Sequence, residues 1–212
     1  MRVRISWRAM KRIVLTGGPG AGKSVVCNAL SAANPNGIVL VPEAATQVYE
    51  ALGSRWDRME IAGRRDAQRK IYALQVEQEA RLAARTRADQ ILLLDRGTID
   101  GAAYWPEGPE AYWKDLGTTL EAELRRYDAV ILLETAAALG IYDGEASNRV
   151  RFEAPSAAIE SGRVLERLWG GHPNFRTVNA HADIAHKIAA VKTILEEEGA
   201  ATPSVAPRER GR

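Results

Sequence analysis

Eight consecutive residues of the chain combine glycine, lysine and serine at a spacing that suits a bound polyphosphate. They match the pattern G-x-x-x-x-G-K-[ST] and are Gly17, Gly18, Pro19, Gly20, Ala21, Gly22, Lys23 and Ser24. A loop of this kind wraps phosphate groups with its backbone N–H groups, and its glycines permit both the turns and the close approach. We therefore predict a nucleotide site that extends from Gly17 through Val25. In it, Lys23 contacts the β- and γ-phosphates of ATP and Ser24 ligates Mg²⁺.

Charged residues also follow two apolar runs farther along the chain. Asp95 and Arg96 come directly after the run at residues 90–94, and Glu43 follows residues 37–41 after one proline. Ligands of open parallel sheets bind at the carboxyl ends of the strands. Asp95 is therefore predicted to hold Mg²⁺ or its water molecules beside the loop.

Glu43 and Arg96 each have two interpretations. Glu43 is a candidate general base that takes a proton from the hydroxyl group of an acceptor. The alternative is a helix start, where Pro42 fits the first helical position and an acidic side chain suits the helix dipole. Arg96 either clamps an acceptor group or only pairs with a carboxylate.

A polar segment with two arginines, Arg149 and Arg151, precedes a short predicted helix. We predict a lid over about residues 140–170 that closes on the transferring phosphoryl group, with both arginines catalytic. The alternative is a solvated basic loop. Arg163 and Arg167 follow on the helix, where a surface position is expected.

Two groups of side chains are candidates to line an acceptor pocket. One is a set of glutamines on one face of a helix predicted at residues 66–85, and the other is an aromatic group that follows residue 97. Glutamines on an inward face need partners, which either a polar ligand or the backbone supplies. The rings form either a ring-binding pocket or part of the core. The residues are Gln68, Gln75 and Gln78, and Tyr104, Trp105, Tyr112 and Trp113.

Five short apolar runs, separated by helical stretches, must position these side chains. Four of the runs are nearly continuous in isoleucine, leucine and valine, which is typical of strands covered on both faces by helices. Leu116, Leu120 and Leu124 recur between them at helical spacing. The alternation of strands and helices predicts the α/β fold class with a doubly wound parallel sheet. The runs lie at residues 12–16, 37–41, 90–94, 129–133 and 175–178.

The composition is that of one globular domain, which we place at residues 1–200, followed by a disordered tail at residues 201–212. Lysine and arginine number 29 against 27 acidic residues, and this net charge of +2 disfavours nucleic-acid binding by bulk electrostatics. Cys27 is the single cysteine, which excludes an internal disulfide and fits a cytoplasmic protein. We expect Cys27 in the core rather than as a nucleophile. Neither a signal peptide nor a membrane helix is expected.

Several segments of the chain, taken in order, resemble the P-loop kinase group. The resemblance is closer to a family of small, mostly bacterial ATP-binding proteins of the AAA type, related to deoxynucleoside and thymidylate kinases. It extends from residue 12 to about residue 197. The segments that carry it are VLTGGPGAGKS, VLVPEAA, LLLDRGTIDGAAYW, YDAVILLE, NRVRFE and WGGHPNFRTVN.

This resemblance implies a P-loop fold with five parallel strands in the order 2-3-1-4-5 and a short lid. It also implies that ATP and Mg²⁺ bind at the loop, that residues 179–183 pass near adenine, and that Glu43, Asp95 and Arg96 face the acceptor. Gly97 departs from the serine or tyrosine that such kinases often carry after the arginine. The identity of the acceptor therefore does not transfer.

Three functions are open for a chain with these features. The first is an ATP-dependent kinase for a small nucleoside- or nucleotide-like acceptor, which acts by in-line phosphoryl transfer. The second is a nucleotide-dependent regulatory ATPase that acts through a protein partner. The third, a nucleic-acid end kinase, is disfavoured by the charge balance. The chain lacks the N-K-x-D signature of guanine-specific switches, and its oligomeric state is open.

Overall fold

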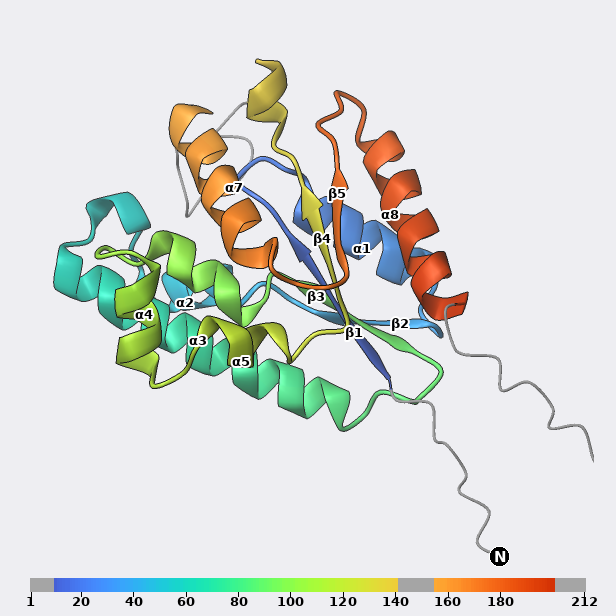
Figure 1. Cartoon of the computed structure of the whole chain (residues 1–212), viewed down its shortest axis with the longest axis horizontal. Helices are drawn as coiled ribbons and strands as arrows, with labels where there is room; N and C mark the ends of the chain where they lie inside the picture. Colours follow the sequence, from blue (N-terminus) through green and yellow to red (C-terminus); the bar gives the residue numbers. More distant parts are fainter. Residues whose placement is uncertain (1–9, 141–154, 201–212) are drawn as a thin grey trace, which may run out of the picture.

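The computed structural model describes residues 10–140 and 155–200. Its centre is a sheet of five parallel strands in the order β2-β3-β1-β4-β5, with helices on both faces (Figure 1). The predicted fold class and the strand order implied by the resemblance are both confirmed. The strands are β1 (Lys11–Thr16), β2 (Ile38–Val41), β3 (Ile91–Asp95), β4 (Ala129–Leu133) and β5 (Phe175–Val178).

The central strands are buried on both faces, which explains their almost continuous apolar sequences. Along β1, Ile13 and Leu15 pack on one side of the sheet and Val14 packs on the other, as the alternation of side chains along a strand requires. Ile13 lies in register with Leu93 of β3 and Ala129 of β4. The sheet is therefore the middle of three layers.

Two helices, α1 (Lys23–Ala33) and α8 (Ile184–Ala200), cover the side of the sheet that carries Ile13. Cys27 of α1 is buried in this layer, and its burial raises the pKa of the thiol. The prediction that Cys27 belongs to the core is confirmed.

The opposite side is covered by helices that contribute to a second apolar cluster, which includes Tyr72, Tyr112, Leu120 and Trp169. These helices are α3 (Ile61–Ala83), α4 (Pro109–Leu116), α5 (Leu120–Leu124) and α7 (Pro155–Trp169). The remaining elements are α2 (Ala44–Leu52) and the short 3₁₀ helices η1 (Trp56–Arg58), η2 (Thr98–Tyr104) and η3 (Ala136–Leu139).

Two helix predictions need correction. The helix predicted at residues 66–85 begins earlier, at Ile61, and ends at Ala83. The leucines at helical spacing lie on two helices rather than one. Gly117 ends α4 with a φ angle of 66°, and Oγ1 of Thr119 then accepts a hydrogen bond that caps α5.

Part of the predicted lid lies outside the described residues. Arg149 and Arg151 belong to that part of the lid. The tail predicted at residues 201–212 also lies outside the described residues. The helix expected after the two arginines is confirmed as α7. Its Arg163 and Arg167 are 65% exposed and lie 3.7 and 3.6 Å from Glu160, so their surface position is confirmed.

Within residues 10–140 and 155–200, no helix is both long enough and apolar enough to cross a bilayer.

Candidate active site

The glycine-rich loop joins the end of β1 to the start of α1, which is the context that the motif requires. Gly17 and Gly22 have φ angles of 138° and 85°, in the region that favours glycine. A Cβ atom at Gly17 would collide with the backbone oxygen of Leu133, and one at Gly22 would lie 2.6 Å from Cδ1 of Ile184. Both positions therefore need glycine for this loop to form.

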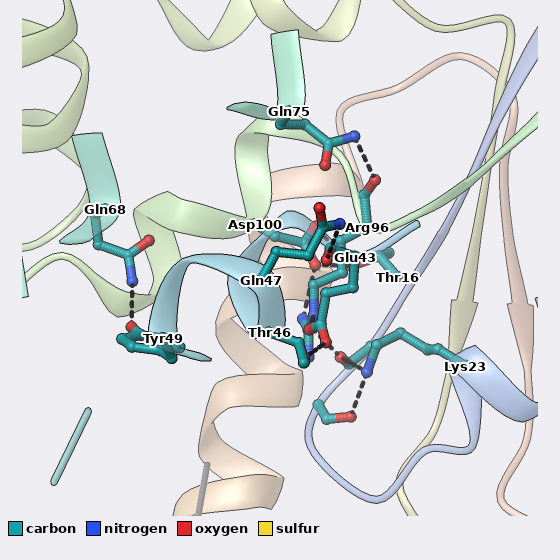
Figure 2. A network of polar contacts seen from close by, with 12 residues as sticks. Thr16, Lys23, Glu43, Thr46, Gln47, Tyr49, Gln68, Gln75, Arg96 and Asp100 are labelled. Atoms are coloured by element: carbon teal, nitrogen blue, oxygen red, sulfur yellow. Dashed lines mark hydrogen bonds and ion pairs between the residues drawn. The ribbon is translucent and has the colours of Figure 1, made fainter. Parts of the chain in front are cut away.

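Lys23 is buried beneath the loop, with 6% of its surface exposed. Its Nζ atom donates to the backbone oxygens of Gly17 at 2.8 Å and Gly18 at 2.9 Å (Figure 2). Burial, and then the positive charge of Arg96, lower the pKa of Lys23 to about 7, although nearby carboxylates act in the opposite direction. A polyphosphate at the loop would favour the charged ammonium.

Asp95 ends β3 with its carboxylate buried against the start of α1. Within the described part of the chain its Oδ1 atom has no hydrogen-bond partner, while the side chain of Ser24 hydrogen-bonds to the carboxylate. Burial, and then the negative charge of Glu43, raise the pKa of Asp95. A buried carboxylate beside a serine hydroxyl fits Mg²⁺, which takes one or two protein ligands together with phosphate and water oxygens.

Glu43 and Arg96 follow the neighbouring strands β2 and β3 and form an ion pair (Figure 2). Nε of Arg96 donates to Oε1 of Glu43 at 2.6 Å, and Oγ1 of Thr46 donates to Oε2 at 2.6 Å. Arg96 has a φ angle of 76°, which is rare for a residue other than glycine. Backbone strain of this kind clusters at functional sites.

These contacts bear on the two interpretations of each residue. Arg96 pairs with carboxylates, as its second interpretation states. Glu43 stands at the N-cap of α2, which begins at Ala44, so the helix start is confirmed but Pro42 precedes the helix instead of opening it. The action of Glu43 and Arg96 on an acceptor stays a prediction.

A third carboxylate, Asp100 in η2, completes this network, and the sequence patterns do not predict it. It accepts hydrogen bonds from Nη1 of Arg96, Oγ1 of Thr16 and Nε1 of Trp169, each at 2.9 Å. The four-residue spacing from Arg96 is the one local signal. Thr16 and Trp169 are 84 and 69 residues away in the sequence, so no local pattern reveals their contacts.

A small cavity of about 20 Å³, roughly the space of one water molecule, lies beside Arg96. The amide nitrogen of Gln68 donates to the hydroxyl of Tyr49, and that of Gln75 donates to the backbone oxygen of Arg96, both at 3.2 Å (Figure 2). These glutamines therefore line a cavity and also have protein partners. The residues predicted for a pocket that line this cavity are Gln68, Gln75, Tyr104 and Tyr112.

The other residues of the two sets lie elsewhere. The amide nitrogen of Gln78 donates to Oε1 of Gln47 at 3.0 Å. Trp105 and Trp113 pack edge to face with Tyr112, at ring-centroid distances of 5.5 and 5.0 Å. For these two tryptophans, the interpretation as core residues is confirmed.

Comparisons with known proteins agree with this arrangement. A family model described as an AAA domain matches residues 12–187. A search of curated proteins finds no significant match.

Solved structures with a similar fold include two kinases. A deoxyadenosine kinase from M. mycoides with bound dATP has a TM-score of 0.59 and 16% identity, over 87% of this chain and 99% of the other. A thymidylate kinase from Candida albicans has a TM-score of 0.63 and 14% identity, over 90% of this chain and 92% of the other. At such identities the likeness establishes the fold.

Proposed function

Because the chain belongs to the AAA domain family and has the fold of the P-loop kinases, we propose that it is an ATP-dependent phosphotransferase. Its substrates would be Mg-ATP and a small acceptor that resembles a nucleoside or nucleotide. The kinases of similar fold act on deoxyadenosine and thymidylate, which supports this class of acceptor. A cytoplasmic location stays a prediction.

The observation that carries the proposal is the ion pair between Glu43 and Arg96 next to the phosphate loop. Both charges act on the pKa of Lys23, which lies under the loop, so the pair belongs to the same electrostatic site. A phosphate loop alone suits any ATPase. A buried carboxylate and guanidinium beside it suit a reaction in which an acceptor hydroxyl is oriented and deprotonated.

In this reaction the loop and Lys23 bind the polyphosphate. Mg²⁺, which Ser24 and Asp95 would hold, supplies positive charge that offsets the charge of the phosphates. Glu43 takes the proton of the acceptor hydroxyl while the acceptor oxygen bonds to the γ-phosphorus and the bond to the ADP oxygen breaks. Arg96 keeps the Glu43 carboxylate in place.

The roles of the other residues predicted for the site stay predictions. The cavity lined by Gln68 and Tyr112 opens beside Arg96, and its size means that an acceptor ring would have to displace side chains to enter. Residues 179–183 stay the predicted neighbours of adenine. Arg149 and Arg151 lie outside the described residues, and their catalytic role stays a prediction from the sequence and the resemblance.

The proposal is tested by measuring ADP release with a panel of nucleosides, nucleotides and other hydroxyl compounds, above the rate of ATP hydrolysis without acceptor. With the active acceptor, Glu43→Gln should lower phosphorylation by about 10² to 10⁴ while Mg-ATP binding persists, because the amide keeps the size but is no base. Glu50→Gln, at an exposed position of the same helix α2, is the control and should keep the wild-type rate.

A different outcome would favour the regulatory ATPase. In that case no acceptor raises ADP release, Glu43→Gln leaves hydrolysis and ATP binding unchanged, and a protein partner binds only the ATP form. This combination would contradict the kinase proposal.

A further inference from the structure

Backbone oxygens of the phosphate loop meet hydrogen-bond donors from the second half of the chain. Oγ1 of Thr135, which follows β4, donates to the backbone oxygen of Pro19 at 2.7 Å. Nζ of Lys187, on α8, donates to the backbone oxygen of Ala21 at 3.1 Å. Helix α8 packs against α1, the helix that the loop opens (Figure 1). Thr135 and Lys187, which are remote from the loop in sequence, therefore both hydrogen-bond to its backbone oxygens.

These contacts orient two peptide planes of the loop. A trans peptide group is planar, and its C=O and N–H bonds point in opposite directions. With the Pro19 oxygen held by Thr135, the N–H of Gly20 points away from Thr135. With the Ala21 oxygen held by Lys187, the N–H of Gly22 points away from α8. Such N–H groups are the donors that a loop of this type offers to phosphate.

A buried lysine such as Lys187 is unusual where a contact only stabilises the fold. Only 1% of its surface is exposed, and its second partner is the backbone oxygen of Glu134, at 2.7 Å. Burial lowers the pKa of its ammonium. A buried charge is costly, and an apolar side chain among Ile184, Ile188 and Val191 of the same helix would stabilise the fold more simply.

We propose that Lys187 is a positioning residue for the phosphate loop. By holding the Ala21 carbonyl outward, it keeps the N–H of Gly22 directed at the polyphosphate, and Thr135 does the same for Gly20. The inference rests on the proposed function, because it requires that the loop binds Mg-ATP and its product Mg-ADP.

The test compares Lys187→Met with Lys192→Met, which removes a 66% exposed lysine from the same helix. Titration calorimetry measures the Kd for Mg-ADP. We expect Lys187→Met to raise this Kd at least about tenfold, because a hydrogen bond from a charged group is lost from the binding conformation. Lys192→Met should stay within about twofold of wild type.

A second measurement separates positioning from mere structural support. If Lys187 only supported the fold, Lys187→Met would lower the unfolding temperature by the same amount with and without saturating Mg-ADP. The positioning role also shrinks the rise in unfolding temperature that a fixed concentration of Mg-ADP produces. Thr135→Val and Thr135→Ser give an independent route if Lys187→Met does not fold. The valine variant should lose Mg-ADP affinity, and the serine variant, which keeps the hydroxyl, should retain it.

The outcomes distinguish the two proposals. If wild type binds Mg-ADP but Lys187→Met, or Thr135→Val in its place, keeps both the Kd and the temperature rise of wild type, the inference is wrong and the proposed function stands. If wild type binds neither Mg-ATP nor Mg-ADP, the proposed function fails and the inference fails with it.

Discussion

At the scale of single residues, burial sets the proton affinity of Lys23. Its pKa of about 7 means that at pH 8 most of the free protein carries a neutral lysine. Negative phosphates favour the ammonium and raise this pKa, so binding of Mg-ADP at pH 8 should take up about one proton. At pH 6 the lysine is already charged, and the uptake should be small.

Calorimetry in two buffers with different ionisation enthalpies measures this uptake. Lys23→Arg, which stays charged at both pH values, is the control and should show no comparable uptake. Asp95 and Glu43 are present in both proteins, so the difference in uptake between the two proteins reports the charging of Lys23 together with the response of these carboxylates. Equal uptake by the two proteins at pH 8 would show that Lys23 is not the titrating group.

Asp95 provides a second prediction, concerning the metal. Asp95→Asn should raise the Mg²⁺ concentration for half-maximal ATP turnover by about tenfold or more, because we propose that Oδ1 of Asp95, which has no partner among the described residues, ligates the ion. Asp89→Asn is the matched control, since Asp89 is exposed and pairs with Arg87 at the surface. Identical metal titrations for Asp95→Asn and wild type would remove Asp95 from the metal site.

Single residues differ in how far the sequence predicts them. The positions of the loop, Lys23 and Asp95 are predicted from the sequence because a local motif or a strand end marks them. Asp100 and Lys187 are missed because most of their partners are far away in the sequence, as with the separation of 166 positions between Lys187 and Ala21. Such groups come together only when the whole chain folds.

At the scale of elements, the strands are predicted better than the helices. A continuous apolar run predicts a strand that is buried on both faces, as it does for β4. Helix ends depend on caps and turns, so Gly117 and Thr119 divide what the leucine spacing suggests is one helix. The polar anchors between elements are also invisible locally, as the contacts of Glu79 show.

Glu79 connects α3 to the segment between α5 and β4. It is fully buried and accepts hydrogen bonds from Tyr127 at 2.9 Å, Arg126 at 2.8 Å and Gln75 at 3.1 Å. Glu79→Gln weakens all three and should lower the free energy of unfolding by about 2 to 3 kcal/mol.

Urea unfolding measures this change. Glu121→Gln is the control, because Glu121 is 77% exposed and its ion pair with Arg125 contributes little. If Glu79→Gln and Glu121→Gln have the same stability, the contacts of Glu79 do not anchor α3.

At the scale of the whole molecule, the candidate site joins both layers of helices through the sheet. Lys23 and Lys187 come from the layer of α1 and α8, whereas Trp169, which donates to Asp100, comes from the opposite layer. A ligand that bridges the phosphate loop and the ends of β2 and β3 would therefore bind the folded protein and not the unfolded chain. Any such ligand stabilises the folded state over the unfolded chain.

Mg-ADP should accordingly raise the unfolding temperature of the entire protein. At a concentration of 100 times its Kd, the stabilisation is about 2.7 kcal/mol. For a chain of this length, that corresponds to a rise of about 5 to 10 °C. Lys23→Ala, measured at the same ligand concentration, should show little of this rise, because loss of the ammonium weakens phosphate binding. Without ligand, the variant should still unfold cooperatively, because burial of the Lys23 charge does not stabilise the wild-type fold. Scanning calorimetry measures the unfolding temperatures of wild type and Lys23→Ala with and without Mg-ADP. A full rise in Lys23→Ala would mean that Mg-ADP stabilises the protein from some place other than the phosphate loop.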